Sequence, residues 1–271
     1  MKNFFTRTLT AGAFVAVLLG CTYYSQISFS ILFFIITILG LLEFYKLVEK
    51  SGAYPQKFVG TSFGGLIFML SSFVCSHILP PIILVLTFPI IALVFIIELF
   101  RNKEKPFSNI GFTLLGLLYV AVPFSLLNFI TTSTGTYNFT ILFGVFFILW
   151  SNDAGAYIVG SLIGKHKLFP RISPAKSWEG SIGGALISYA IVFIISGWYT
   201  CISFFDWLII ATILIVIGTL GDLVESLFKR SINVKDSGTL LPGHGGILDR
   251  FDSLIISTPF IVAYLYLIQI L

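Results

Sequence analysis

Long apolar runs recur along the whole chain, and charged positions are concentrated between them or at their ends. A helix needs roughly 20 apolar residues to cross a bilayer, and about nine runs approach that length. They predict spans at about 9–24, 28–48, 58–78, 81–100, 107–130, 139–160, 181–200, 204–228 and 251–271. The pattern predicts an all-α integral membrane protein with one polytopic domain over 1–271. Residues 1–135 would form a scaffold of spans, and residues 136–271 would carry the chemistry.

The composition supports this interpretation. Of 271 residues, 57% are hydrophobic and only 10% are charged, and the mean hydropathy is +1.00. A soluble domain carries about 25% charged residues. These values exclude a soluble enzyme, a disordered chain and a nucleic-acid-binding domain, so no nucleic-acid partner is expected. The three cysteines lie far apart and predict neither a zinc site nor a disulfide framework.

The basic residues predict an orientation. All 16 Lys and Arg fall in the N-terminus and in the stretches 46–57, 101–106, 161–180 and 229–250. The intervening links have none, so the positive-inside rule places the N-terminus in the cytoplasm and the C-terminus outside. We expect a bacterial inner membrane. One alternative concerns only the first span, because residues 18–21 loosely resemble a lipoprotein cleavage site.

Several acids lie where a membrane protein rarely keeps them. An ionised carboxylate at the bilayer centre costs about 2.5–3.5 kcal/mol, so such residues are usually functional. Asp222 and Glu225 are three residues apart, and so are Asp249 and Asp252. The two members of each pair would therefore share a helix face. Such oxygen clusters suit Mg²⁺, although pairing with Lys229, Arg230 or Arg250 is the simpler alternative. The acids in or at the ends of spans are Asp153, Asp222, Glu225, Asp249 and Asp252.

Three other acids have plainer interpretations. Glu43 and Glu98 each precede a basic residue by three positions, Lys46 and Arg101 respectively. Local ion pairing would explain both. Asp206 begins the eighth predicted span and is expected to be a helix-start or interface residue.

The stretch 229–250 predicts a phosphate site beside the acids. Its glycines would break a helix and let backbone N–H groups approach an anion, and the positive end of the next helix faces the same stretch. Positive or hydrogen-bonding side chains accompany them. The candidates are Gly243, Gly245, Gly246, Lys229, Arg230, Lys235 and His244.

The stretch 161–180 is a second basic loop. Gly160 to Lys165 nearly matches a P-loop, but the glycine spacing is wrong and His166 stands where Ser or Thr should be. No strand precedes it, so a P-loop is rejected. A plain positive-inside loop and a loop that binds a nucleotide or anionic lipid headgroups stay open.

Here the residues become diagnostic of a family. The segments SLFKR at 226–230, KD at 235–236 and PGHGGILDRFD at 242–252 resemble the signature of the phosphatidate cytidylyltransferases. The segments ND at 152–153, GKHK at 164–167, SP at 173–174 and KSWEG at 176–180 are also similar to that family. Ala175 and Ser177 are mild departures, where a more basic residue and Thr are expected.

The resemblance implies a reaction in which CTP and phosphatidic acid give CDP-diacylglycerol and pyrophosphate. It implies Mg²⁺ on Asp222, Asp249 and Asp252, with a second cation such as K⁺ as an open addition and Glu225 as a weaker ligand. The resemblance also assigns candidate residues to two roles, catalysis and the binding of the nucleotide or lipid headgroup. The catalytic group is Asp222, Asp249, Asp252, Lys229, Arg230 and His244, and the bordering group is Lys235, Gly243, Gly245, Gly246, Asp153, Lys165, Ser173 and Lys176.

Rival classes remain. A CTP-dependent polyprenol kinase would share the spans and the nucleotide, but not the complete segment 242–252. A cation-coupled transporter would keep polar groups near the midplane and often show repeats. A CDP-alcohol phosphotransferase would need a spaced aspartate motif that is absent. A homodimer stays open, and acyl-chain preference is not fixed by the sequence.

Overall fold

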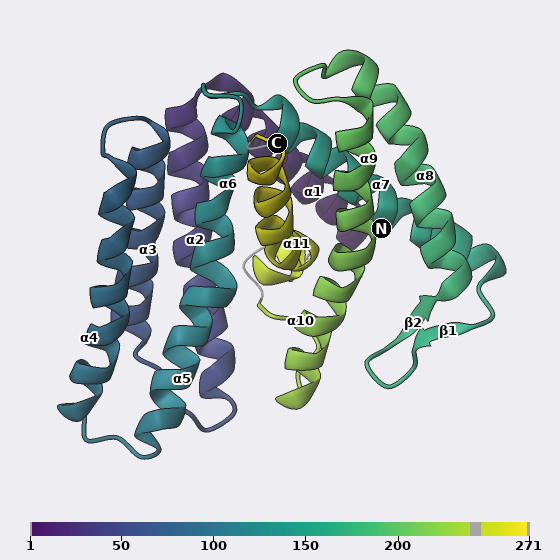
Figure 1. Ribbon diagram of the computed structural model, residues 1–271. Coiled ribbons are helices and arrows are strands. Elements are labelled where there is room, and N and C mark those ends of the chain that lie inside the picture. Colours follow the sequence, from purple (N-terminus) through teal and green to yellow (C-terminus); the bar gives the residue numbers. More distant parts are fainter. Residues whose placement is uncertain (1, 239–244, 270–271) are drawn as a thin grey trace. The chain divides into compact units, whose positions relative to one another are not determined.

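The computed structural model describes residues 2–238 and 245–269 (Figure 1). The chain divides into two compact units. The N-terminal unit is Met1–Phe129 with Ser231–Phe251, and the C-terminal unit is Ile130–Arg230 with Asp252–Leu271. Residues 231–251 therefore belong with the N-terminal unit, although they are distant from it in sequence.

The N-terminal unit consists of helices. In chain order they are α1 (Lys2–Tyr24), α2 (Gln26–Glu49), α3 (Lys57–Cys75), the 3₁₀ helix η1 (Pro81–Leu86), α4 (Thr87–Leu99), α5 (Pro106–Gly116), the π-helical turn η2 (Leu117–Ala121) and most of α6 (Val122–Thr132).

The C-terminal unit adds a small sheet to its helices. Its elements are α7 (Thr140–Ile163), β1 (Lys167–Phe169), β2 (Ser173–Ser177), α8 (Trp178–Trp198), α9 (Phe204–Ile213), the π-helical turn η3 (Leu214–Gly218), α10 (Thr219–Ser231) and α11 (Leu248–Leu267). The division between the units crosses α11 between Phe251 and Asp252.

Within the described residues, eight helical segments are long and apolar enough to cross a membrane. They correspond to the second to ninth predicted spans, and the first predicted span lies in α1, whose apolar part is Thr10–Tyr24. The prediction of an all-α membrane protein is confirmed, with one exception. The stretch 161–180 was expected to be a loop, but it contains the antiparallel pair β1–β2 (Figure 1).

Hydroxyl side chains set several helix starts. Ser25 accepts the backbone N–H of Ser28 at 3.1 Å and so caps α2. Ser203 caps α9 in the same way, and the carboxylate of Asp206 accepts the Ser203 backbone N–H at 3.0 Å. This reciprocal arrangement satisfies donors that a helix start leaves without partners. The expectation that Asp206 is a helix-start residue is confirmed.

Tyr45 packs the centre of the N-terminal unit. Its side chain is fully buried, and its hydroxyl donates to the Thr113 carbonyl oxygen at 2.9 Å. A Cβ at Gly116 would lie 2.6 Å from that hydroxyl oxygen. Gly60 of α3 is similarly close to the same ring. Glycine at both positions gives the tyrosine room between two helices.

Trp207 has the same role in the C-terminal unit. It is fully buried, and its indole N–H donates to the Tyr199 carbonyl oxygen at 3.0 Å. Its ring occupies the space that a side chain at Gly144 would need. Close packing of α7 on α9 thus depends on that glycine.

We expect Gly144→Val to destabilise the C-terminal unit by about 1–3 kcal/mol, because the added methyl groups collide with the Trp207 ring. The measurement is the melting temperature of the purified protein in detergent. Gly197→Val is the matched control, since a Cβ at Gly197 meets no atom within 4 Å. Equal melting temperatures for the two variants would contradict the packing argument.

Candidate active site

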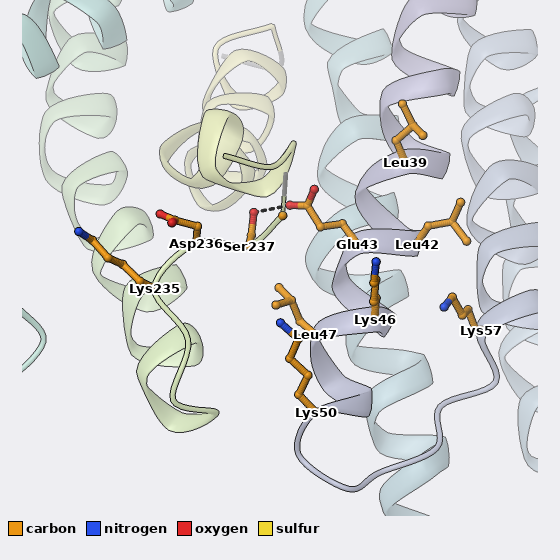
Figure 2. A pocket seen from close by; sticks show the side chains of 11 residues that line it. Leu39, Leu42, Glu43, Lys46, Leu47, Lys50, Lys57, Lys235, Asp236 and Ser237 are labelled. Carbon is orange, nitrogen blue, oxygen red and sulfur yellow. Dashed lines mark hydrogen bonds between the residues drawn. The ribbon is translucent and has the colours of Figure 1, made fainter. Parts of the chain in front are cut away.

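Glu43 on α2 holds the segment that leads into α11. Its carboxylate accepts the backbone N–H groups of Ile247 at 2.9 Å and Leu248 at 3.0 Å. It also accepts the Ser237 hydroxyl, as Figure 2 shows. The first turn of a helix has N–H groups without intrahelical partners, and it attracts negative charge. Glu43 therefore caps α11 from another helix.

Asp249, in the first turn of α11, also binds this segment. Its carboxylate accepts the backbone N–H of Ser237 at 3.0 Å and that of Gly246 at 2.8 Å. Ser237 and Gly246 precede and follow residues 239–244, so two carboxylates bind both flanks of that stretch. The predicted contacts of Gly243 and His244 lie outside the described residues.

The glycines of this segment lie against carboxylates of the chain itself. A Cβ at Gly238 would lie 2.7 Å from an oxygen of Glu43, and a Cβ at Gly246 would be closer still to the same carboxylate. Gly245 has φ +84°, which side-chain-bearing residues rarely adopt, and it faces Asp249. The prediction that these glycines allow close approach of a substrate anion stays a prediction.

The interpretation of Glu43 as a local partner of Lys46 is wrong. Within the described residues, Lys46 makes no ion pair, and the Glu43 carboxylate is taken by Ser237 and by backbone N–H groups. The interpretation of Glu98 is confirmed, because Arg101 lies 2.8 Å from its carboxylate. That carboxylate also accepts Gln56 at 2.7 Å and Asn109 at 2.9 Å.

In the C-terminal unit, the hairpin β1–β2 leads directly into α8. Ser177, the last residue of β2, accepts the Gly180 N–H at 3.1 Å and caps the helix. Glu179 in the first turn accepts the backbone N–H of Lys165 at 3.1 Å and contacts the His166 ring at 2.5 Å. These contacts fix the connection between α7 and the hairpin.

A cavity of about 270 Å³ opens beside this hairpin. Side chains from α7, β2, α8 and α10 line it, and three of the predicted site residues are among them: Asp153, Lys176 and Asp222. The Lys176 ammonium pairs with the Asp222 carboxylate. We call this the C-terminal cavity.

Asp252 on α11 belongs to the same charged group. Its carboxylate interacts electrostatically with Asp222, Glu225 and Asp153. Gly221 lets α10 and α11 approach closely, since a Cβ there would lie 2.9 Å from the Asp252 carbonyl oxygen. The predicted acids of this unit are thus neighbours in space as well as in pattern.

Two ammonium groups accompany these four carboxylates. Lys176 pairs with Asp222. Lys229 pairs with Glu225 one helical turn away, and both of these residues are buried. Carboxylate oxygens are the donors that Mg²⁺ prefers, so the expected metal depends on how closely these acids can gather. No group of three or more His, Cys, Asp or Glu side chains in the described ranges is close enough to share a metal ion.

The remaining predicted residues lie elsewhere. Lys165 and Arg230 are exposed, and Ser173 pairs with Phe169 in the hairpin. Lys235 lines a different cavity, which lies wholly within the N-terminal unit (Figure 2). Sequence reasoning assigned no chemistry to the other lysines of that cavity, Lys46, Lys50 and Lys57. The spacing of Lys46 and Lys50, one helical turn apart at the end of α2, was the available signal.

The sequence pattern of the cytidylyltransferase family matches residues 5–268. The chain belongs to the cytidylyltransferase family. It is 46% identical over 175 residues to the phosphatidate cytidylyltransferase of Staphylococcus saprophyticus, and this match covers 63% of this chain and 65% of that protein. It is 44% identical over 156 residues to the phosphatidate cytidylyltransferase of Bacillus subtilis, and this match covers 57% of this chain and 58% of that protein. The matches thus span less than two thirds of these relatives' lengths. The family resemblance inferred from the motifs is confirmed.

We expect Glu43→Ala to loosen the start of α11, because the Ile247 and Leu248 N–H groups and the Ser237 hydroxyl lose their acceptor. The loss should lower the free energy of unfolding by about 1–3 kcal/mol. Hydrogen exchange of a peptide covering 245–255 should become faster.

The matched control is Glu49→Ala, which removes an exposed carboxylate of the same helix that only pairs with Lys57 at 3.5 Å. Glu43→Gln keeps one acceptor oxygen and should show an intermediate effect. Unchanged exchange in Glu43→Ala would refute the capping role.

Proposed function

We propose that this protein transfers the cytidylyl group of CTP to phosphatidic acid, giving CDP-diacylglycerol and pyrophosphate. The reaction would serve phospholipid biosynthesis at the cytoplasmic face of a bacterial inner membrane. The family membership and the names of the two relatives support this activity. The membrane setting agrees with the eight apolar helices of the described residues.

The C-terminal cavity is the observation that carries the proposal. It gathers Asp153, Lys176 and Asp222 from three separate elements, with Asp252 within electrostatic range. Nucleotidyl transfer needs little covalent help from a protein, because positioning and charge neutralisation supply most of the catalysis. A compact group of acids and a lysine beside helices that span the membrane suits a reaction between a soluble nucleotide and a lipid.

In the proposed reaction, an oxygen of the lipid phosphate attacks the α-phosphorus of CTP. A new P–O bond forms there, the bond to the β-phosphate oxygen breaks, and pyrophosphate leaves with that electron pair. Lys176 is placed to interact with a phosphate oxygen once its pairing with Asp222 loosens. Asp153 lines the same cavity and would help to set the position of the nucleotide or headgroup.

The acids of the C-terminal unit are the ligands that we propose for a divalent cation. Asp222 and Asp252 would hold Mg²⁺, because their mutual repulsion falls when a cation lies between carboxylates. When bound, Mg²⁺ stabilises the charge that develops on phosphate oxygens. The involvement of Asp249 and of a second cation such as K⁺ stays a prediction, since the Asp249 carboxylate accepts N–H groups in the N-terminal unit.

Radiolabelled CTP separates the proposed transferase from a lipid kinase. With phosphatidic acid present, label at the α-phosphorus should enter the lipid, and label at the γ-phosphorus should appear in pyrophosphate. Entry of the γ-label into lipid would favour the kinase. Absence of turnover with phosphatidic acid, CTP and Mg²⁺ in a protein that melts cooperatively would contradict the proposal.

We expect Asp252→Asn to weaken Mg²⁺ binding by about 100-fold or more, since even residues behind a metal's ligands typically contribute 10–100-fold. The readouts are turnover and the rise in melting temperature on Mg²⁺ titration. Without metal, the variant should be no less stable than the wild type, because it removes a carboxylate that three neighbouring acids repel.

Asp206→Asn is the control in the same unit, because it keeps an oxygen for the cap of α9. If Mg²⁺ stabilised Asp252→Asn as strongly as it stabilises the wild type, the metal assignment of Asp252 would be wrong.

A further inference from the structure

A basic cleft in the N-terminal unit has no role in the chemistry described so far. Its volume is about 820 Å³. Three of its four lysines, Lys46, Lys50 and Lys57, come from the end of α2 and the start of α3, and the apolar side chains of Leu42 and Leu47 lie beside them (Figure 2). The fourth, Lys235, directs its ammonium group away from the other three. We call the region around Lys46, Lys50 and Lys57 the lysine cleft.

These lysines are available to an anion. Lys46 and Lys50 are exposed, and their side-chain ammonium groups make no hydrogen bond or ion pair with any residue that the structure describes. Lys57 pairs with Glu49 at 3.5 Å, with both side chains more than a third exposed, and such a surface pair contributes little. Of the two acids in the cleft, Glu43 is already engaged by the segment before α11.

An apolar groove joins the lysine cleft. It has a volume of about 460 Å³ and runs between α2 and α3, along residues such as Phe34, Ile38, Phe58 and Met69. Leu42 lines both the groove and the cleft, so the two are adjacent. Both helices are long and apolar enough to cross the membrane, and the groove therefore faces the region where acyl chains lie.

This combination selects an amphiphile. A lone cluster of lysines at a span end would be explained by the positive-inside rule. Here the lysines line a cavity, and an apolar groove adjoins that cavity at Leu42. A nucleotide has nothing to place in that groove. A zwitterionic lipid gives the lysines no net charge to neutralise, whereas a phosphomonoester near neutral pH carries about −1.5 to −2.

We infer that the α2–α3 face of the N-terminal unit binds a lipid phosphomonoester, with an acyl chain in the groove and the phosphate at Lys46, Lys50 and Lys57. The inference rests on the proposed function in taking the acceptor, phosphatidic acid, as the occupant. It assigns a substrate-binding role to a half of the chain that the sequence interpretation treated as a scaffold.

The first experiment uses the full-length protein in nanodiscs of phosphatidylcholine and a phosphatidic acid analogue with a diazirine in one acyl chain. After illumination, cross-links should fall on peptides from α2 and α3 that line the groove. Phosphatidic acid should compete, and extra phosphatidylcholine or CTP should not. Cross-links spread evenly over all spans, or displaced equally by phosphatidylcholine, would overturn the inference.

The second experiment removes the charges. Lys46→Gln/Lys50→Gln should weaken phosphatidic acid binding and raise its KM about tenfold or more, since each basic residue near an anionic lipid surface contributes substantially. The KM for CTP should not change. Lys103→Gln/Lys105→Gln is the matched control, because it removes the same charge from the link between α4 and α5.

A third variant tests the apolar groove. A bulky Met69→Trp should block the groove, whereas Leu118→Trp at an exposed position should not.

The outcomes separate the two proposals. Specific cross-linking without any CDP-diacylglycerol formation would leave the lipid site standing and refute the proposed function. Turnover with an unchanged KM for phosphatidic acid in Lys46→Gln/Lys50→Gln would refute the lipid site alone. A raised KM for CTP with unchanged lipid binding would assign the lysines to the nucleotide and overturn the inference.

Discussion

The cost of ionised carboxylates in an apolar, largely helical protein governs how this chain is built. With so few charged residues, each buried acid needs donors or a cation close by. The Glu98 carboxylate accepts hydrogen bonds from Gln56, Arg101 and Asn109. Glu225 forms an ion pair with Lys229. Glu43 is satisfied by Ser237 and by the first turn of α11. The partners of Glu98 and Glu43 come from other helices and segments, so in these two cases the pairing of charge also specifies the packing.

The group around Asp252 differs from those solutions. Its carboxylate is repelled by the nearby acids Asp222, Glu225 and Asp153, and the described residues give it only the Ser253 backbone N–H as a donor. Such an arrangement is unfavourable for folding alone, and it becomes favourable when a cation or a positively charged side chain lies among the acids. The C-terminal cavity therefore has the electrostatic character of a binding site, whereas the environment of Glu98 has the character of a structural contact. The two kinds of acid can be told apart by their partners.

The sequence predicted the spans well, because hydropathy over a window of about 20 residues reports directly on membrane insertion. It also grouped Asp222 and Asp252, which both lie in the C-terminal unit, with Asp249, whose carboxylate accepts N–H groups in the N-terminal unit. It did not predict the β1–β2 hairpin, because short strands between helices have a weak periodic signal. The role of Glu43 was missed for another reason. A carboxylate three residues before a lysine looks locally paired, and its partners lie about 200 positions away in the sequence.

The glycine-rich segment has partners within the chain that its sequence pattern did not reveal. The pattern indicated backbone N–H groups that meet an anion, and the structure places the carboxylates of Glu43 and Asp249 against that backbone. An approaching phosphate would compete with these carboxylates for the N–H groups of Gly246, Ile247 and Leu248. Basic side chains are the groups left to attract it.

Glu43 and the segment that it caps lie about 200 positions apart in the sequence, yet they must be inherited together. Consider a chimera of two family members, with its first half from one parent and residues 231–251 from the other. In it, the carboxylate at position 43 and the backbone that it contacts come from different parents. Crossovers between these positions should therefore be tolerated only when both parents place an acid at the position of Glu43 and glycines at the positions of Gly238 and Gly246. The contact thus defines which parts of the chain must be inherited together.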